Sequence, residues 1–152
     1  MANLTQLRSG AVLYNVDHSV GRFGRNRMTD VQLVQVLLNA LIKDIKATGR
    51  GLPGSAPIPE LLSEDGICGS NTMAAILWYQ KSQSGVAKDA TVNSIDASEQ
   101  YGTPGNYNYY TLWGINVMLE ARNALPSQFD ITIQPLASEV RRFSKKLHVW
   151  LG

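Results

Sequence analysis

The feature that most constrains the fold of this chain is a helical spacing of apolar residues that stops at a run of glycine and proline. Between Asp30 and about Thr48, apolar side chains recur every three or four residues, which places them on one face of a helix. They are Val31, Val34, Leu38, Leu41, Ile42 and Ile45. Glycine and proline then recur as far as Pro59, and neither continues a helix. We predict an amphipathic helix over residues 30–48 and a long loop over 49–64.

A second helix follows this loop. Asp65-Gly66 is a turn signal, and Gly69 can begin a helix with Thr72 in its first turn. The apolar face of this helix consists of Ala75, Ile76 and Tyr79. The pattern therefore predicts a turn followed at once by an amphipathic helix that ends near Gln80.

The two segments together resemble the peptidoglycan-binding domain family, small helical modules that accompany cell-wall enzymes. In that family D-V-x-x-V/L-Q-x-x-L precedes D-G-x-F-G-x-x-T-x-x-A-V-x-x-F-Q, and G-L/V-x-x-D follows. This chain is similar over residues 30–38, 65–80 and 85–89, with Cys68 and Tyr79 at positions where the family usually has phenylalanine or another apolar residue. The resemblance implies a helical fold that binds the wall without cutting it.

Beyond Asp89 the chain departs from the fuller family form, because a second D-G-x-x-G is missing. Residues 91–96 suggest a short capped helix, and Thr111 to about Ala124 suggests a helix that is apolar on nearly all sides. Residues 136–151 predict a further helix with an apolar stripe facing a basic one. The stripe is Leu136, Val140, Phe143, Leu147 and Leu151.

These segments predict an all-α fold in a single domain over residues 1–152. A three-helix peptidoglycan-binding-like core would occupy residues 19–100, and two C-terminal helices in residues 101–152 would pack on it. Residues 1–29 look mostly irregular. Their glycine- and arginine-rich stretch, 19–27, lacks the spacing of a phosphate-binding loop, so we expect a turn that leads into a helix capped by Asp30.

Composition narrows the class of protein. Fourteen basic and twelve acidic residues leave a net charge of +2, too small to indicate nucleic acid, and Cys68 is the only cysteine. No run of apolar residues is long enough to span a membrane. Residues 1–20 lack the pattern of a secretory signal. We therefore expect a cytoplasmic protein that reaches the periplasm or cell envelope with a phage lysis or injection system.

Enzymatic chemistry finds little support in the sequence. A zinc hydrolase normally needs at least two histidines close together, and His18 and His148 lie at opposite ends of the chain. A glycosidase needs two placed carboxylates, and no acidic residue here stands in a recognisable catalytic pattern. We expect no catalytic residue, no metal and no cofactor.

A site that binds a muropeptide needs an aromatic platform, with amide, hydroxyl and cationic donors around a shallow groove. The family resemblance places this groove beside the first helix and the start of the second. The candidate contacts are Gln35, Ser70, Asn71, Thr72, Gln80 and Tyr107. Both glutamines could instead tie helices together, Thr72 could be a helix cap, and the tyrosines near Tyr107 could plug the core.

Three functions remain open. The first is non-catalytic peptidoglycan binding that targets or anchors a lytic enzyme or a secretion component. The second is a protein adaptor, or an accessory or immunity component of a phage or contractile injection system, which keeps the fold and has lost sugar binding. The third, less favoured, is a peptidoglycan hydrolase. The expected partners are peptidoglycan or a lytic or secretion-system protein, and neither nucleic acid nor a membrane.

Overall fold

A computed structural model describes residues 2–6, 12–54, 56–96 and 110–126 of the chain. Three helices and four short strands lie within these ranges. In chain order they are β1 (Asn3–Gln6), β2 (Val12–Asn15), β3 (Val20–Gly21), α1 (Met28–Thr48), α2 (Ser70–Lys81), β4 (Thr91–Val92) and α3 (Thr111–Ala121). The helices predicted from residue 30, from Gly69 and from Thr111 are therefore confirmed.

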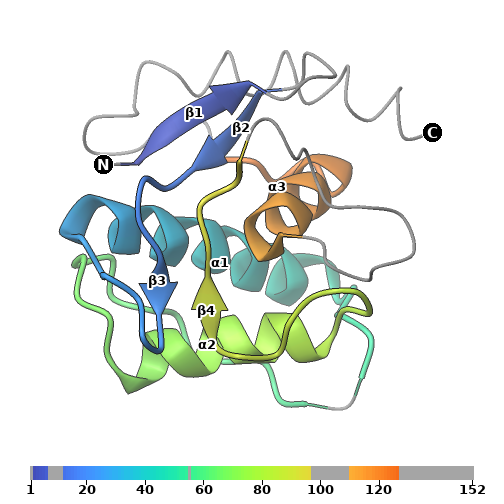
Figure 1. Cartoon of the computed structure of the whole chain (residues 1–152). Coiled ribbons are helices and arrows are strands. Elements are labelled where there is room, and N and C mark those ends of the chain that lie inside the picture. Colours follow the sequence, from blue (N-terminus) through green and yellow to red (C-terminus); the bar gives the residue numbers. More distant parts are fainter. Residues whose placement is uncertain (1, 7–11, 55, 97–109, 127–152) are drawn as a thin grey trace.

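The helices form the body of the molecule, and the strands lie along it (Figure 1). Helices α1 and α2 begin at the same end, close to the turn that follows β3 (Figure 1). Helix α1 contacts α2, α3 and β3, while α3 also contacts β2. Buried apolar side chains from β2, α1, α2 and α3 form one cluster, so the described elements share a single core.

The prediction of an all-α fold is wrong. Strands β1 and β2 pair antiparallel, with Leu4 opposite Tyr14, and β3 pairs antiparallel with β4, with Val20 opposite Val92. In β2 both Leu13 and Tyr14 are fully buried, so the strand lacks the alternation that marks a half-exposed strand. Strands β3 and β4 are two residues each, too short for any periodicity.

Two local predictions are also wrong. Residues 91–96 form β4 and extended chain rather than a short helix. Asp30 does not cap α1, because Arg27 is the N-cap residue and makes no side-chain cap. The Asp30 carboxylate is buried and accepts the backbone N–H groups of Asp17 and His18, each at 3.1 Å. It therefore holds the preceding segment against the helix instead of capping the helix end.

Asparagine side chains replace much of the hydrogen bonding that longer sheets would supply. In each of three asparagines, the side-chain Oδ1 accepts the N–H of one distant residue and Nδ2 donates to the carbonyl oxygen of the same residue, at 2.8–3.0 Å. The pairs are Asn15 with Ile95, Asn39 with Leu62, and Asn116 with Tyr14. Such an amide imitates one rung of a strand ladder, so irregular chain is fixed on the core without extended strands.

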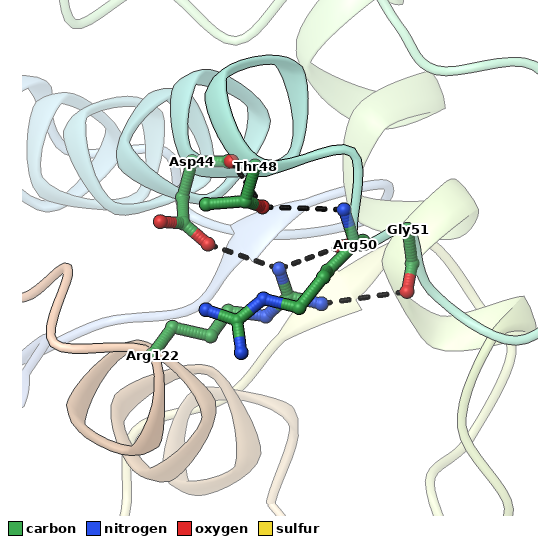
Figure 2. Close-up of polar contacts among 5 residues, drawn as sticks. All are labelled: Asp44, Thr48, Arg50, Gly51 and Arg122. Atoms are coloured by element: carbon green, nitrogen blue, oxygen red, sulfur yellow. Dashed lines mark hydrogen bonds and ion pairs between the residues drawn. The ribbon is translucent and has the colours of Figure 1, made fainter.

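The start of the long loop after α1 is held from the end of α3. Gly49 ends α1 in the left-handed conformation, with φ of 73°. Arg122 pairs with Asp44 at 3.0 Å and donates to the carbonyl oxygens of Arg50 and Gly51 (Figure 2). The Asp44 and Arg122 side chains are 14% and 15% exposed, so this contact ties α1, α3 and the loop together at a largely buried point. The helix predicted over residues 136–151 lies outside the described residues.

Candidate functional site

The Gln35 side chain lies at the centre of a buried network rather than on the surface. Its Nε2 atom lies within 3.0–3.2 Å of Asp65 Oδ1, the Ile67 carbonyl and Thr72 Oγ1. Its Oε1 atom accepts the Gly66 N–H at 2.9 Å. Because both ends of the amide are engaged within the fold, Gln35 joins α1 to the turn and to the first turn of α2.

Gln80 makes the same arrangement one helix later. Its Nε2 atom lies within 3.0–3.1 Å of Asp89 Oδ1, the Thr91 carbonyl and Thr111 Oγ1, and Oε1 accepts the Ala90 N–H at 2.8 Å. Both glutamines are essentially unexposed. The geometry thus favours the structural alternative for these two amides and for Thr72, which is buried as well.

Two of the candidate contacts do face outward. Ser70 and Asn71 are exposed on the first turn of α2. They follow, by three and four residues, Ile67, a large apolar side chain that is 67% exposed. Tyr107 lies outside the described residues. The structure therefore leaves the start of α2 as the outward-facing part of the predicted groove.

Beside this start lies the turn of residues 22–28, whose importance the sequence pattern did not reveal. Asn26 holds the turn from within, since its Oδ1 accepts the Gly21 N–H at 2.7 Å and its Nδ2 donates to the carbonyls of Gly21 and Gly24. The Asn26 N–H donates to the Ser19 carbonyl. These bonds fix the backbone of the turn without using the side chains of Phe23 or the arginines.

Phe23 is the most unusual residue of this turn. It has φ of 62° and its side chain is 96% exposed. The left-handed conformation is rare for a bulky residue and costs about 1–2 kcal/mol. The guanidinium of Arg22 lies over the Phe23 ring, 5.9 Å from its centre, which orients the ring without burying it. A large aromatic between glycine and arginine residues is the sequence signal that could have identified this position.

The 22–28 turn and the start of α2 form one continuous face. Met28, which is 67% exposed, packs so closely on Gly66 that a Cβ atom there would lie 2.4 Å from Met28 Cγ. Burial raises the pKa of the Cys68 thiol, and the Gly21 backbone, which lies beside the thiol, opposes this shift. Phe23, Met28 and Ile67 thus give this face three exposed apolar side chains, a feature that marks interaction surfaces.

The face is also basic. Arg22, Arg25 and Arg27 are all exposed, and within the described part of the chain none of them forms an ion pair. The nearby Asp65 carboxylate accepts the Ile67 N–H at 2.9 Å, and this bond, followed by the one from Gln35, lowers its pKa. Asp65 therefore stays ionised at neutral pH, and its carboxylate accepts hydrogen bonds from Ile67 and Gln35.

The described residues contain no cluster of three or more histidine, cysteine or acidic side chains that could hold a metal ion. Among the described residues, two hollows are lined by none of the residues of the basic face. One, of about 500 Å³, lies between α1 and the end of α3 and includes Val36, Lys43 and Asn123. The other, of about 440 Å³, lies between the long loop and the end of α2 and includes Leu52, Trp78 and Lys81. Neither includes any of the predicted contact residues.

Comparisons of this chain with known protein families, with curated proteins and with solved structures find no match. Among the described helices, none is both long and apolar enough to cross a membrane. The functional argument therefore depends on the chain's own geometry and on the motif resemblance.

Proposed function

We propose that this protein is a non-catalytic module that binds bacterial peptidoglycan through the face formed by the 22–28 turn and residues 67–71. Two things support the proposal. The D-G-x-x-G-x-x-T pattern resembles that of peptidoglycan-binding domains, and it lies on the same face as the exposed apolar and basic side chains. In this role the module targets or anchors an associated lytic enzyme or secretion component.

Phe23 is the observation that carries the proposal. Its conformation costs stability, and its exposed ring gains almost nothing from burial. The surrounding hydrogen bonds of Asn26 nevertheless hold it in place. Residues in strained backbone conformations are found most often at binding and catalytic sites, because the strain lowers stability. A rigid, projecting aromatic ring is the platform on which the apolar face of a sugar packs.

The remaining groups of the face match the polar parts of a muropeptide. Ser70 and Asn71 offer hydroxyl and amide groups for N-acetyl and peptide groups, and the arginines offer donors for carboxylates. No bond has to form or break and no proton has to move. Because the face is shallow, we expect modest affinity per module, which suits an anchor on a wall that presents many copies of its ligand.

The experiment that tests the proposal is co-sedimentation of the purified protein with isolated sacculi, followed by analysis of the supernatant for muropeptides. We expect the protein to sediment and to release nothing. The Phe23→Ala variant should bind at least about tenfold more weakly, as expected for an aromatic anchor at the centre of an interface. Leu61→Ala is the matched control, because it removes an exposed apolar side chain from the long loop.

Thermal unfolding of both variants separates lost binding from lost folding. Since Phe23 is exposed and alanine keeps the same Cβ at positive φ, we expect Phe23→Ala to be about as stable as the wild type. Release of muropeptides would overturn the non-catalytic proposal in favour of a hydrolase. A folded protein that stays in the supernatant would overturn wall binding, and the exposed apolar face would then belong to a protein adaptor.

A further inference from the structure

We infer that the 22–28 turn recognises an unamidated carboxylate of the peptidoglycan stem peptide, with Arg25 and Arg27 as the groups that bind it. This inference rests on the proposed function and specifies the chemical group that the face selects. Stem peptides carry carboxylates that become neutral amides when they are amidated, so the charge of the wall varies at this group. A face that needs the carboxylate would distinguish one wall from another.

The first argument is the contrast between paired and unpaired arginines. Arg122 is largely buried and pairs with Asp44 and two backbone carbonyls (Figure 2). Arg25 and Arg27 are exposed, and the described residues provide no carboxylate for either guanidinium. The arginine that stabilises the fold is therefore satisfied internally, whereas those of the turn keep their donors for a ligand.

Three acidic side chains, on α1 and in the segment before α2, already accept hydrogen bonds within the fold. Asp30 is buried and accepts the N–H groups of Asp17 and His18. Asp65 accepts the Ile67 N–H and the Gln35 amide. Glu64 Oε1 accepts the Asn39 amide at 3.0 Å. An incoming carboxylate therefore meets two guanidiniums that form no ion pair with any acidic side chain among the described residues.

The arginines also occupy positions that stability does not favour. Arg27 is the N-cap residue of α1, and Arg25 lies two residues before it. The N-terminus of a helix carries partial positive charge, so cations are unfavourable there and anions are favourable. A bound carboxylate would offset the repulsion between the two arginines and the helix N-terminus. Ligand binding therefore explains the presence of arginines at positions where they do not stabilise the free protein.

The shape of the guanidinium selects the ligand group. Its planar fork donates two parallel hydrogen bonds to a carboxylate, and a neutral amide can accept at only one oxygen. Phe23 belongs to the same turn, where its exposed ring lies under the guanidinium of Arg22 and offers a sugar its apolar face. The 22–28 turn thus combines a platform for the glycan with donors for the peptide attached to it.

The test compares native sacculi with sacculi whose carboxylates have been amidated with carbodiimide and ammonia. Both are stripped of teichoic acid, so that wall phosphate cannot act as the anion. The proteins are the wild type, the double variant Arg25→Gln/Arg27→Gln and the double variant Lys43→Gln/Lys46→Gln. The lysine control removes the same charge from exposed positions on α1, the helix that Arg25 and Arg27 precede. Lys46 lies about 27 Å along α1 from Met28, at 1.5 Å per residue.

We expect the wild type and the lysine variant to bind native sacculi at least about tenfold more tightly than amidated sacculi. The arginine variant should bind both preparations equally, at the weaker level. Equal and tight wild-type binding to both preparations would overturn the inference and leave peptidoglycan binding intact. An equal loss in the lysine and arginine variants would overturn it as well, because general charge would then explain binding. If the wild type bound neither preparation, the proposed function itself would fail.

Discussion

The turn before α2 and the turn before β4 have the same hydrogen bonds but different residues. In each, a buried glutamine of the preceding helix engages an aspartate, the next N–H, the following carbonyl and a threonine of the next helix. In each, the aspartate also accepts the N–H two residues on, at 2.9 and 3.0 Å. The middle residue has φ of 76° in one and 60° in the other.

The two turns differ in the residue at this middle position. The first turn has Gly66, which adopts positive φ freely, and the second has Ala90, which does so at a cost. Only the first turn therefore carries the Asp-Gly pattern that a sequence reader recognises. The comparison shows that the same arrangement of hydrogen bonds can form without the Asp-Gly sequence pattern.

Removing the central amide should have the largest effect, and it should be equal in the two turns. Gln35→Met or Gln80→Met keeps the side-chain volume but leaves a buried N–H and its neighbours without partners. We expect each to lower the free energy of unfolding by about 3 kcal/mol, measured by urea unfolding. Gln32→Met, which loses a single bond to the Glu64 carbonyl, is the control and should cost about 1 kcal/mol or less. Strongly unequal losses would show that the two networks are not equivalent.

Exchanging the middle residues should have effects of opposite sign. Gly66→Ala imposes positive φ on alanine and places a Cβ 2.8 Å from the Met28 carbonyl oxygen, so we expect a loss of about 2 kcal/mol. Ala90→Gly relieves the strain at φ of 60° and should gain about 0.5–1 kcal/mol. The same urea series measures both. A loss in Ala90→Gly would mean that the buried methyl contributes more than the strain costs.

The second turn borders a hydroxyl that the fold does not satisfy. Tyr79 Oη is fully buried, finds no hydrogen-bond partner among the described residues, and would lie 2.5 Å from a Cβ at Gly114. Tyr79→Phe should therefore raise the free energy of unfolding by about 1 kcal/mol. Gly114→Ala should be destabilising alone and tolerated in combination with Tyr79→Phe. Destabilisation by Tyr79→Phe would show that the hydroxyl has a partner after all.

The smallest expected effect is a pH dependence at the first turn. Hydrogen bonds, chiefly from the Ile67 N–H and then from Gln35, lower the pKa of Asp65 below its ordinary value of 3.8. A lowered native pKa means that the contribution is complete above 3.8 and is lost as pH falls below it. The urea midpoint of Asp65→Asn should depend less on pH over this acidic range than that of the wild type. The control Glu60→Gln, on the long loop, should keep the wild-type dependence. If the pH dependence of the urea midpoint were the same in Asp65→Asn as in the wild type, the Asp65 carboxylate would not contribute to acid stability.

The helices were predictable because each leaves a long periodic trace in the sequence. The segment 30–48 matches α1 to within two residues, and Asp65-Gly66 identifies the turn before α2. The strands were not predictable, because β3 and β4 are fixed by distant contacts such as Gly21 against the Ala90 carbonyl. Those contacts join residues about seventy positions apart and have no local signature.

The location of the candidate site stays a prediction, but the structure separates its exposed residues from its buried ones. The pattern located the start of α2, where Ser70 and Asn71 are exposed, yet it also nominated Gln35, Thr72 and Gln80, whose polar atoms are directed inward. A sequence pattern does not distinguish an amide that holds the fold from one that contacts a ligand, because the same residue type can do either. Phe23 was missed because its conformation and exposure become visible only in three dimensions.

The most direct measurement of the central claim is a titration of the ¹⁵N-labelled protein with soluble muropeptides, followed by amide chemical shifts. The account predicts shifts concentrated in residues 21–28 and 67–71, with both glutamine networks nearly unperturbed. Shifts confined to the hollow beside Trp78 or the hollow beside Asn123, or no shifts at muropeptide concentrations that saturate sacculi binding, would contradict it.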